Sequence, residues 1–237
     1  MMNEYGLVVI IYFIFAIIFL QSITLMKPAI IFDFDGTIAD SFGVIKNILL
    51  NLSDDFGYKK PTDKQINLLR TKHPKEIMRI LGLSYFKLPF LIHRVDKEIQ
   101  RQIAAVKPIE GIKEVLIQLK SQHYLLGMVT SANEKNVSAF LKNNDLEVFD
   151  FIQTGSSIFG KARILKKVLK KQKIGKKEVL YVGDEIRDIE AAKKVGIKMI
   201  AVTWGFNNRE GLQQFHPDML IDTPSELLVS LNTIREL

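Results

Sequence analysis

Short apolar segments that alternate with helical patterns constrain the fold of this chain more than any other feature. Ala29–Phe32 is an apolar run that is too short for a helix and is followed by Asp and Gly, so it predicts a buried strand. Similar runs occur within residues 124–130, 149–155, 178–184, 198–205 and 218–221, with amphipathic helical patterns between most of them. This alternation predicts an α/β fold with a doubly wound parallel sheet, in which ligands bind outside the carboxyl ends of the strands.

One long segment interrupts this alternation. Over residues 42–107 the apolar residues recur at intervals of three to four, and prolines at 61, 74 and 89 divide the pattern into several helices. The spacing predicts an all-helical insertion. We therefore expect a catalytic core made of residues 27–41 and 108–237, with a helical insertion at residues 42–107.

The N-terminal segment, residues 1–26, has two interpretations. Leu7–Met26 carries no charge and has the length of a membrane-spanning helix. Lys27 follows the run and no Lys or Arg precedes it, which disfavours a secretory signal and would place the rest of the chain in the cytoplasm as a tethered domain. The alternative is a mis-assigned start site, because Met26 stands directly before the first strand and would begin a cytoplasmic enzyme without an anchor.

Composition narrows the classes of ligand only a little. The chain has no cysteine, which excludes disulfides and thiolate metal sites. Its formal net charge of +7 suits an anionic substrate, a nucleic acid or an anionic membrane surface. A lysine-rich stretch at residues 166–177 has no interleaved aromatic residues, so we interpret it as a solvated helix face and expect no nucleic-acid partner.

Polar clusters follow four of the predicted strands. Each has an ordinary explanation when taken alone: a glycine turn, a helix cap, a solvated lysine, or an acidic first turn of a helix. Together they bring carboxylates, hydroxyls and a lysine to one edge of the sheet. The clusters contain Asp33, Asp35 and Thr37; Thr130, Ser131 and Asn133; Gly160 and Lys161; and Gly183, Asp184, Glu185 and Asp188.

The combined cluster points to phosphate chemistry with a metal ion. Several carboxylates in one place repel one another unless a cation lies between them, and an all-oxygen ligand set without His or Cys favours Mg²⁺. A lysine and small hydroxyls suit the oxygens of a phosphate group, and a free carboxylate can attack phosphorus. Asp33 and Asp35 are two residues apart, so both side chains can point toward this site.

In this order and spacing, the segments "DFDGT", "VTSAN", "GK" and "GDEIRD" resemble motifs I to IV of the haloacid dehalogenase-like hydrolase superfamily. The resemblance extends from Ala29 to about Leu228, and the helical insertion is similar to the C1 cap of the phosphoglycolate-phosphatase-like branch. It implies a Rossmann-like sheet with a cap. It also implies a Mg²⁺-dependent phosphoric monoester hydrolase that acts on a small phosphorylated metabolite through an aspartyl-phosphate.

The same resemblance implies a role for each motif residue. Asp33 would be the nucleophile, Asp35 the acid and base for the leaving oxygen and for water, and Lys161 the cation that neutralises Asp33 and the phosphate. The implied metal ligands are Asp33, Asp35 through its backbone carbonyl, Asp184 and Asp188. The implied substrate-binding residues are Gly36, Thr37, Thr130, Ser131 and Ala132. Two positions depart from the family pattern: the third motif lacks a Lys-Pro pair, and Glu185 follows Asp184.

Other functions stay open at this stage. A phosphomutase would use the same motifs, and a phosphonate hydrolase would need a Schiff-base lysine in the insertion, such as Lys46 or Lys64. A third alternative is a non-catalytic, membrane-tethered binding module that retains the haloacid dehalogenase-like fold. A basic group in the insertion could bind an anionic substrate tail, although we interpret it as solvated helix-end charge; it comprises Arg70, Lys72, His73 and Lys75.

Overall fold

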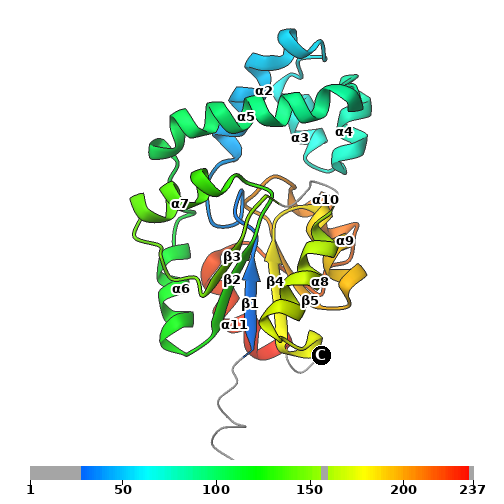
Figure 1. The fold of residues 1–237 in the computed structure, drawn as a ribbon. Helices are drawn as coiled ribbons and strands as arrows, with labels where there is room; N and C mark the ends of the chain where they lie inside the picture. Colours follow the sequence, from blue (N-terminus) through cyan, green and yellow to red (C-terminus); the bar gives the residue numbers. More distant parts are fainter. Residues whose placement is uncertain (1–27, 156–159, 235–237) are drawn as a thin grey trace, which may run out of the picture.

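A six-stranded parallel sheet forms the centre of the molecule in the computed structural model, which describes residues 28–155 and 160–234 (Figure 1). The strands lie in the order β3-β2-β1-β4-β5-β6, and every neighbouring pair is parallel. This confirms the predicted doubly wound α/β fold. The strands are β1 (Ala29–Phe32), β2 (Leu125–Val129), β3 (Phe151–Gln153), β4 (Val179–Gly183), β5 (Lys198–Val202) and β6 (Met219–Ile221).

The register of the central strands brings their carboxyl ends to one level. Phe32, the last residue of β1, pairs with Met128 of β2 on one side and with Val182 of β4 on the other. The residues that follow these strands therefore emerge side by side, although the chain separates them widely. Parallel pairing thus gathers the polar clusters at one edge of the sheet.

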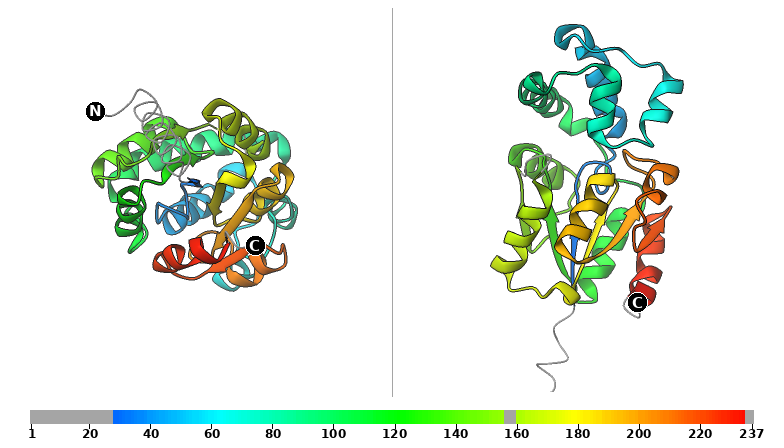
Figure 2. Two further views of the ribbon diagram at one scale, coloured as in Figure 1. Left: turned by 90° about the horizontal axis from the view of Figure 1, so that it is seen from below. Right: turned by 90° about the vertical axis from the view of Figure 1, so that its right-hand side faces the viewer.

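Helices cover both faces of the sheet, as the side view of Figure 2 shows. Ile30 and Phe32 point to a core shared with α6 (Ile112–Ser121), α7 (Glu134–Asn143) and α11 (Pro224–Ile234). Ala29 and Ile31 point to the opposite core. That second core is shared with α8 (Lys161–Gln172), α9 (Ile186–Val195) and α10 (Arg209–Gln213). The alternation of β1 side chains between two buried cores explains why the whole strand is apolar.

A group of helices stands beyond the carboxyl ends of the strands (Figure 1). Proline lies in the first turn of both α4 and α5, where its missing N–H costs no hydrogen bond. We propose that residues 42–107 form a cap over the sheet edge, with residues 27–41 and 108–237 as the core. The helices of this group are α2 (Phe42–Phe56), α3 (Asp63–Leu69), α4 (Pro74–Leu81) and α5 (Leu88–Gln102). Short 3₁₀ turns lie at Tyr85–Lys87 and Ile103–Ala105 in this group, and at Lys176–Glu178 before β4.

The predicted membrane anchor, residues 7–26, lies outside the residues that the structure describes. Within residues 28–155 and 160–234, no helix combines the length and the apolar character that crossing a bilayer requires. The two interpretations of the N-terminal segment therefore stay predictions.

Gly127 in β2 provides a test of the packing between β2 and β3. A Cβ at this position would lie 2.1 Å from Cζ of Phe151, so a side chain cannot fit without moving the ring. We expect Gly127→Ala to lower the free energy of unfolding by about 1–3 kcal/mol, measured by urea denaturation.

Gly43→Ala in α2 is the matched control, because a Cβ at that position would have no other atom within 4 Å. We expect this change to leave stability equal or to raise it by up to about 1 kcal/mol. Adding Phe151→Leu should recover part of the loss in Gly127→Ala. Equal stabilities of the two alanine variants would contradict the packing described here.

Candidate active site

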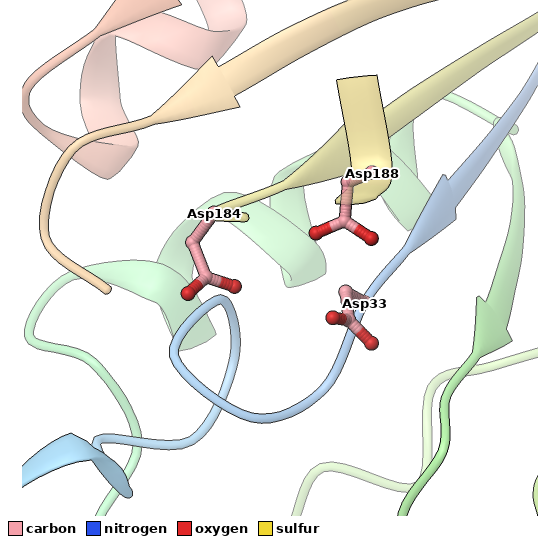
Figure 3. Close-up of side chains that lie close together, drawn as sticks. All are labelled: Asp33, Asp184 and Asp188. Atoms are coloured by element: carbon pink, nitrogen blue, oxygen red, sulfur yellow. The ribbon is translucent and has the colours of Figure 1, made fainter. Parts of the chain in front are cut away.

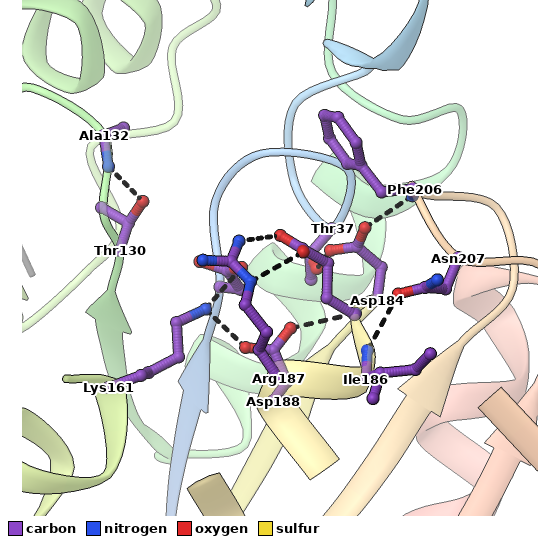
Figure 4. A network of polar contacts seen from close by, with 12 residues as sticks. Thr37, Thr130, Ala132, Lys161, Asp184, Ile186, Arg187, Asp188, Phe206 and Asn207 are labelled. Carbon is purple, nitrogen blue, oxygen red and sulfur yellow. Dashed lines mark hydrogen bonds and ion pairs between the residues drawn. The ribbon is translucent and has the colours of Figure 1, made fainter. Parts of the chain in front are cut away.

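Lys161 lies at the centre of the polar cluster. It is the first residue of α8, and its side chain is only 4% exposed. Its Nζ donates to Oδ2 of Asp33 at 2.7 Å. The same Nζ donates to Oδ1 of Asp188 at 2.5 Å (Figure 4). Burial alone would lower the pKa of Lys161, but the carboxylates of Asp188 and Asp33 outweigh burial and raise it above its usual range. The ammonium group is therefore held charged between two acids.

Asp33 directly follows β1 and joins the sheet through its backbone. Its N–H donates to the carbonyl of Val182 at 2.9 Å, and the residue is 4% exposed. Burial raises the pKa of the Asp33 carboxyl to about 7, although the Lys161 ammonium opposes the rise. The buried carboxylate therefore depends on nearby cations for its charge.

Asp184 follows β4 and is fully buried. Its Oδ1 accepts a hydrogen bond from the Thr37 hydroxyl at 2.7 Å, and its Oδ2 accepts one from the backbone N–H of Phe206 at 2.7 Å. Burial, together with the charges of Glu185 and Asp33, raises the pKa of Asp184 well above its usual range. These two donors fix the plane of the carboxylate while leaving lone pairs for another ligand.

Asp188 lies in the first turn of α9 and is also fully buried. Its Oδ2 accepts from the backbone N–H of Glu185 at 3.0 Å, and its Oδ1 accepts from the Tyr181 hydroxyl at 3.1 Å as well as from Lys161. A first-turn acid that caps its own helix is a common arrangement. Here the same carboxylate also faces the polar cluster.

Asp33, Asp184 and Asp188 lie close together, as Figure 3 shows. One oxygen from each carboxylate lies within 4.8 Å of the others. Three buried carboxylates against one lysine leave excess negative charge, and hard oxygen donors are the ligands that divalent ions such as Mg²⁺ prefer. The three residues therefore fit a divalent metal ion.

Asp35 lies apart from this three-carboxylate group. It is half-buried in the turn after β1, and burial raises the pKa of its carboxyl to about 6. Its backbone is held by a bridge to Ala39. Asp35 thus lies at the same edge of the sheet as the three metal-binding candidates. Among the described residues, the group of clustered carboxylates does not include it.

Gly36 and Thr37 pack against Asp184. Gly36 has a φ of +74°, and a Cβ there would lie 2.4 Å from Oδ2 of Asp184, so both the backbone angle and the available space require glycine. Thr37 is fully buried and uses its hydroxyl on the same carboxylate. Both residues therefore contact Asp184, and their expected part in substrate binding stays a prediction.

Thr130, Ser131 and Ala132 follow β2, on the other side of β1 from Asp184. Thr130 is buried, its N–H donates to the carbonyl of Gln153 at 3.0 Å, and its Oγ1 accepts from the N–H of Ala132 at 3.0 Å. Its hydroxyl hydrogen can still be donated to a ligand. The loop after β2 therefore lies beside Asp33, on the side opposite Asp184 and Asp188.

An ion pair that the sequence analysis missed borders the site. The Arg187 guanidinium makes a two-point contact with Glu185, in which Nε lies 2.8 Å from Oε2. The guanidinium outweighs burial and lowers the pKa of Glu185. The only sequence signal was a Glu and an Arg two residues apart, a spacing that does not indicate a pair on a regular helix.

A basic cavity of about 220 Å³ opens beside Lys161. The cap contributes His73 and Lys75 to its wall, and α9 contributes Arg187, Glu190 and Lys194. A larger cavity of about 480 Å³ lies at the amino ends of β1 and β2 and contains none of the predicted site residues. The smaller cavity is therefore the one next to the acidic cluster, and its charge favours an anionic ligand.

The pKa shifts predict how ion binding depends on pH. Asp33 and Asp35 have pKa values raised to about 7 and about 6, so between about pH 4 and pH 7 the folded, ion-free protein retains protons that the unfolded chain has released. These shifted groups therefore lower the stability of the ion-free protein as pH rises through that window. A divalent ion displaces the proton of Asp33, so its stabilising effect must grow with pH.

We expect Mg²⁺ to raise the melting temperature more at about pH 8 than at about pH 5.5. Each pH unit below the Asp33 pKa reduces the ion's contribution by up to about 1.4 kcal/mol per displaced proton. Calorimetry with and without Mg²⁺ measures this effect, and Asp184→Asn serves as a variant with a weakened site. The same increase in melting temperature at both pH values would contradict it.

Two comparisons with known proteins each match most of this chain. Residues 30–202 match the model of the family described as haloacid dehalogenase-like hydrolase. A phosphoglycolate phosphatase from Synechococcus elongatus is 37% identical over 207 residues, which cover 87% of this chain and 98% of that protein.

Solved structures show the same architecture. A haloacid dehalogenase-like hydrolase family protein from Streptococcus pneumoniae superposes with a TM-score of 0.73 at 26% identity, covering 87% of this chain and 99% of the other. A putative β-phosphoglucomutase from Thermotoga maritima has a TM-score of 0.63 at 24% identity, with 87% and 99% covered, which shows a shared fold alone.

Proposed function

We propose a reaction from one premise: this chain belongs to the haloacid dehalogenase-like hydrolase family and is a phosphatase. Its substrate is a small phosphomonoester, and the phosphoryl group passes through an aspartyl-phosphate on Asp33. The observation that carries the proposal is the contact of Lys161 with both Asp33 and Asp188 inside a cluster of three buried carboxylates.

The divalent ion is part of the proposal. Asp33, Asp184 and Asp188 would hold it, and we infer Mg²⁺ from the all-oxygen ligand set. When bound, such an ion supplies positive charge that lets the anionic substrate approach a carboxylate. The backbone carbonyl of Asp35 is a further proposed ligand.

In the first step, a carboxylate oxygen of Asp33 attacks phosphorus and the bond from phosphorus to the ester oxygen breaks. Lys161 orients Asp33 through its 2.7 Å contact and offsets the charge that gathers on the phosphoryl oxygens. Asp35 gives its proton to the leaving alkoxide. Its pKa of about 6 supports this role, because a fraction of the carboxyl is protonated near neutral pH.

In the second step, water attacks the phosphoryl group on Asp33. Asp35, now ionised, takes a proton from that water, and the acyl-phosphate bond breaks to release phosphate and restore both carboxyl groups. We propose that the Thr130 hydroxyl and the backbone N–H groups after Asp33 and Thr130 bind the phosphoryl oxygens. Within the described residues the N–H groups of Phe34 and Asp35 donate to no protein acceptor, which supports this placement.

The substrate class follows from the basic cavity next to Lys161. Its volume of about 220 Å³ suits a small metabolite, and its cationic walls favour a second acidic group on the substrate. Phosphoglycolate is the first compound to test, because the relative from Synechococcus elongatus is named for it. A phosphomutase would instead return the phosphoryl group to a sugar, and assays for inorganic phosphate and for isomerised sugar phosphate separate the two reactions.

Asp33→Asn tests the proposed nucleophile. We expect kcat to fall by roughly 10⁴-fold or more, because a carboxamide cannot form the acyl-phosphate. Phosphate release from phosphoglycolate with Mg²⁺ is the measurement, and far-UV circular dichroism should show an unchanged fold.

Asp40→Asn is the matched control, since Asp40 is an exposed acid on the same loop. It should retain the activity of the unmodified protein. Hydrolysis by Asp33→Asn within tenfold of that activity would contradict the assignment of Asp33.

A further inference from the structure

The cap meets the core at several places, among them α5, where the Asp96 carbonyl accepts from Asn136 of α7 at 3.3 Å. A second place is a short segment between α3 and α4, Arg70–His73, which we call the cap contact segment. Asn207 donates from Nδ2 to the carbonyl of Arg70 at 2.8 Å and to that of Lys72 at 3.2 Å. The backbone N–H of Asn208 also donates to the Arg70 carbonyl, at 3.1 Å. Asn207 is only 3% exposed, so the contact is part of the packed interior.

The cap contact segment and α10 pack closely against each other. A Cβ on Gly211 would lie 2.7 Å from Cα of Thr71 and 2.8 Å from the Arg70 carbonyl oxygen. Both of these atoms belong to the backbone of the cap contact segment, so they cannot turn away as a flexible side chain could. Glycine at this position therefore allows the cap to rest on α10.

The Arg70 side chain extends this contact toward the acidic cluster. Its Nη2 donates to the Gly205 carbonyl at 2.7 Å, and its Nε donates to the Phe206 carbonyl at 3.1 Å. The guanidinium also lies over the Phe42 ring, 4.7 Å from its centroid. Two directed donors and a stacked ring hold this planar group in one orientation, which lysine cannot reproduce.

One peptide unit joins Arg70 to Asp184. The carbonyl of Gly205 accepts from Arg70, and the N–H of the same peptide, on Phe206, donates to Oδ2 of Asp184 at 2.7 Å. Because the peptide is planar, holding its oxygen also fixes the direction of its N–H. A cationic donor on the carbonyl additionally polarises the N–H and strengthens its bond to the carboxylate.

Asn207 forms a second connection between the same two regions. Its Oδ1 accepts from the N–H of Ile186, the first residue of α9, at 2.9 Å, and its N–H donates to the Asp184 carbonyl at 3.3 Å (Figure 4). The loop of residues 205–207 thus contacts the cap on one side and the Asp184 loop on the other. A shift of the cap would disturb both sets of hydrogen bonds.

We propose that Arg70 is a positioning residue through which docking of the cap strengthens divalent-ion binding by Asp184 and its neighbours. This inference rests on the proposed function, which places the ion at these acids. By thermodynamic linkage, the ion then strengthens docking of the cap by the same factor. Docking of the cap is therefore most stable when the ion is bound.

Trp204 supplies a direct readout. It is the single tryptophan of the chain, it precedes Gly205, and its Nε1 donates to the Thr37 carbonyl at 3.2 Å. Titration of the full chain with Mg²⁺ alone, followed by Trp204 fluorescence and by calorimetry, measures ion affinity without any substrate. We expect Arg70→Gln to weaken Mg²⁺ binding about fivefold or more.

Two further variants separate this role from general loss of structure. Arg79→Gln removes an exposed arginine of α4 and should leave the Mg²⁺ Kd unchanged. Gly211→Ala leaves Arg70 intact but forces the cap contact segment away, so it should weaken Mg²⁺ binding to a similar degree. Hydrogen exchange of peptides covering residues 70–73 and 205–211 should slow on adding Mg²⁺ to the unmodified protein, and slow less in Arg70→Gln.

Equal Mg²⁺ affinities of the unmodified protein, Arg70→Gln and Gly211→Ala would overturn the inference. So would hydrogen exchange at residues 70–73 that does not respond to Mg²⁺. A different result, in which the unmodified protein binds no divalent ion, would overturn the proposed function itself and remove the basis of the coupling. The substrate-free measurement therefore keeps the two failures apart.

Discussion

The contact of the Lys161 ammonium with Asp33 and Asp188 is the interaction on which the rest of the site depends. It occurs where burial makes an isolated charge costly, so each partner stabilises the charged form of the other. Three carboxylates against one ammonium leave two negative charges, which matches a divalent cation. Glu185 adds little to this excess, because Arg187 neutralises it. The charge balance therefore favours a divalent cation among these acids.

The sheet and the cap contribute to this site in different ways. Parallel pairing aligns the ends of β1, β2 and β4, so that Asp33, Thr130 and Asp184 emerge beside one another. The cap contributes no member of the acidic cluster; its Arg70 reaches the peptide that donates to Asp184. The sheet thus sets where the acids lie, and we propose that the cap, through Arg70, affects how Asp184 is held.

Much of this arrangement could be predicted from the sequence, because it follows from local patterns. Apolar runs predicted the strands, and acids at strand ends must meet at one sheet edge whatever their separation in the chain. Contacts between distant side chains could not be predicted in this way. One such contact is the hydrogen bond from Thr37 to Asp184, which lies 147 positions away. Arg70 was interpreted as a solvated helix-end charge, yet it donates to carbonyls in a loop 135 and 136 positions away. No periodicity in the sequence encodes such pairs.

Trapping the phosphorylated protein during turnover tests the central claim most directly. The protein would be mixed with phosphoglycolate and Mg²⁺, quenched rapidly in acid, digested and analysed by mass spectrometry. The account predicts one phosphoryl group on the peptide that contains Asp33, attached to Asp33 and not to Asp35. A phosphoryl group attached to any other residue, or turnover without any phosphorylated peptide across a full range of quench times, would contradict it.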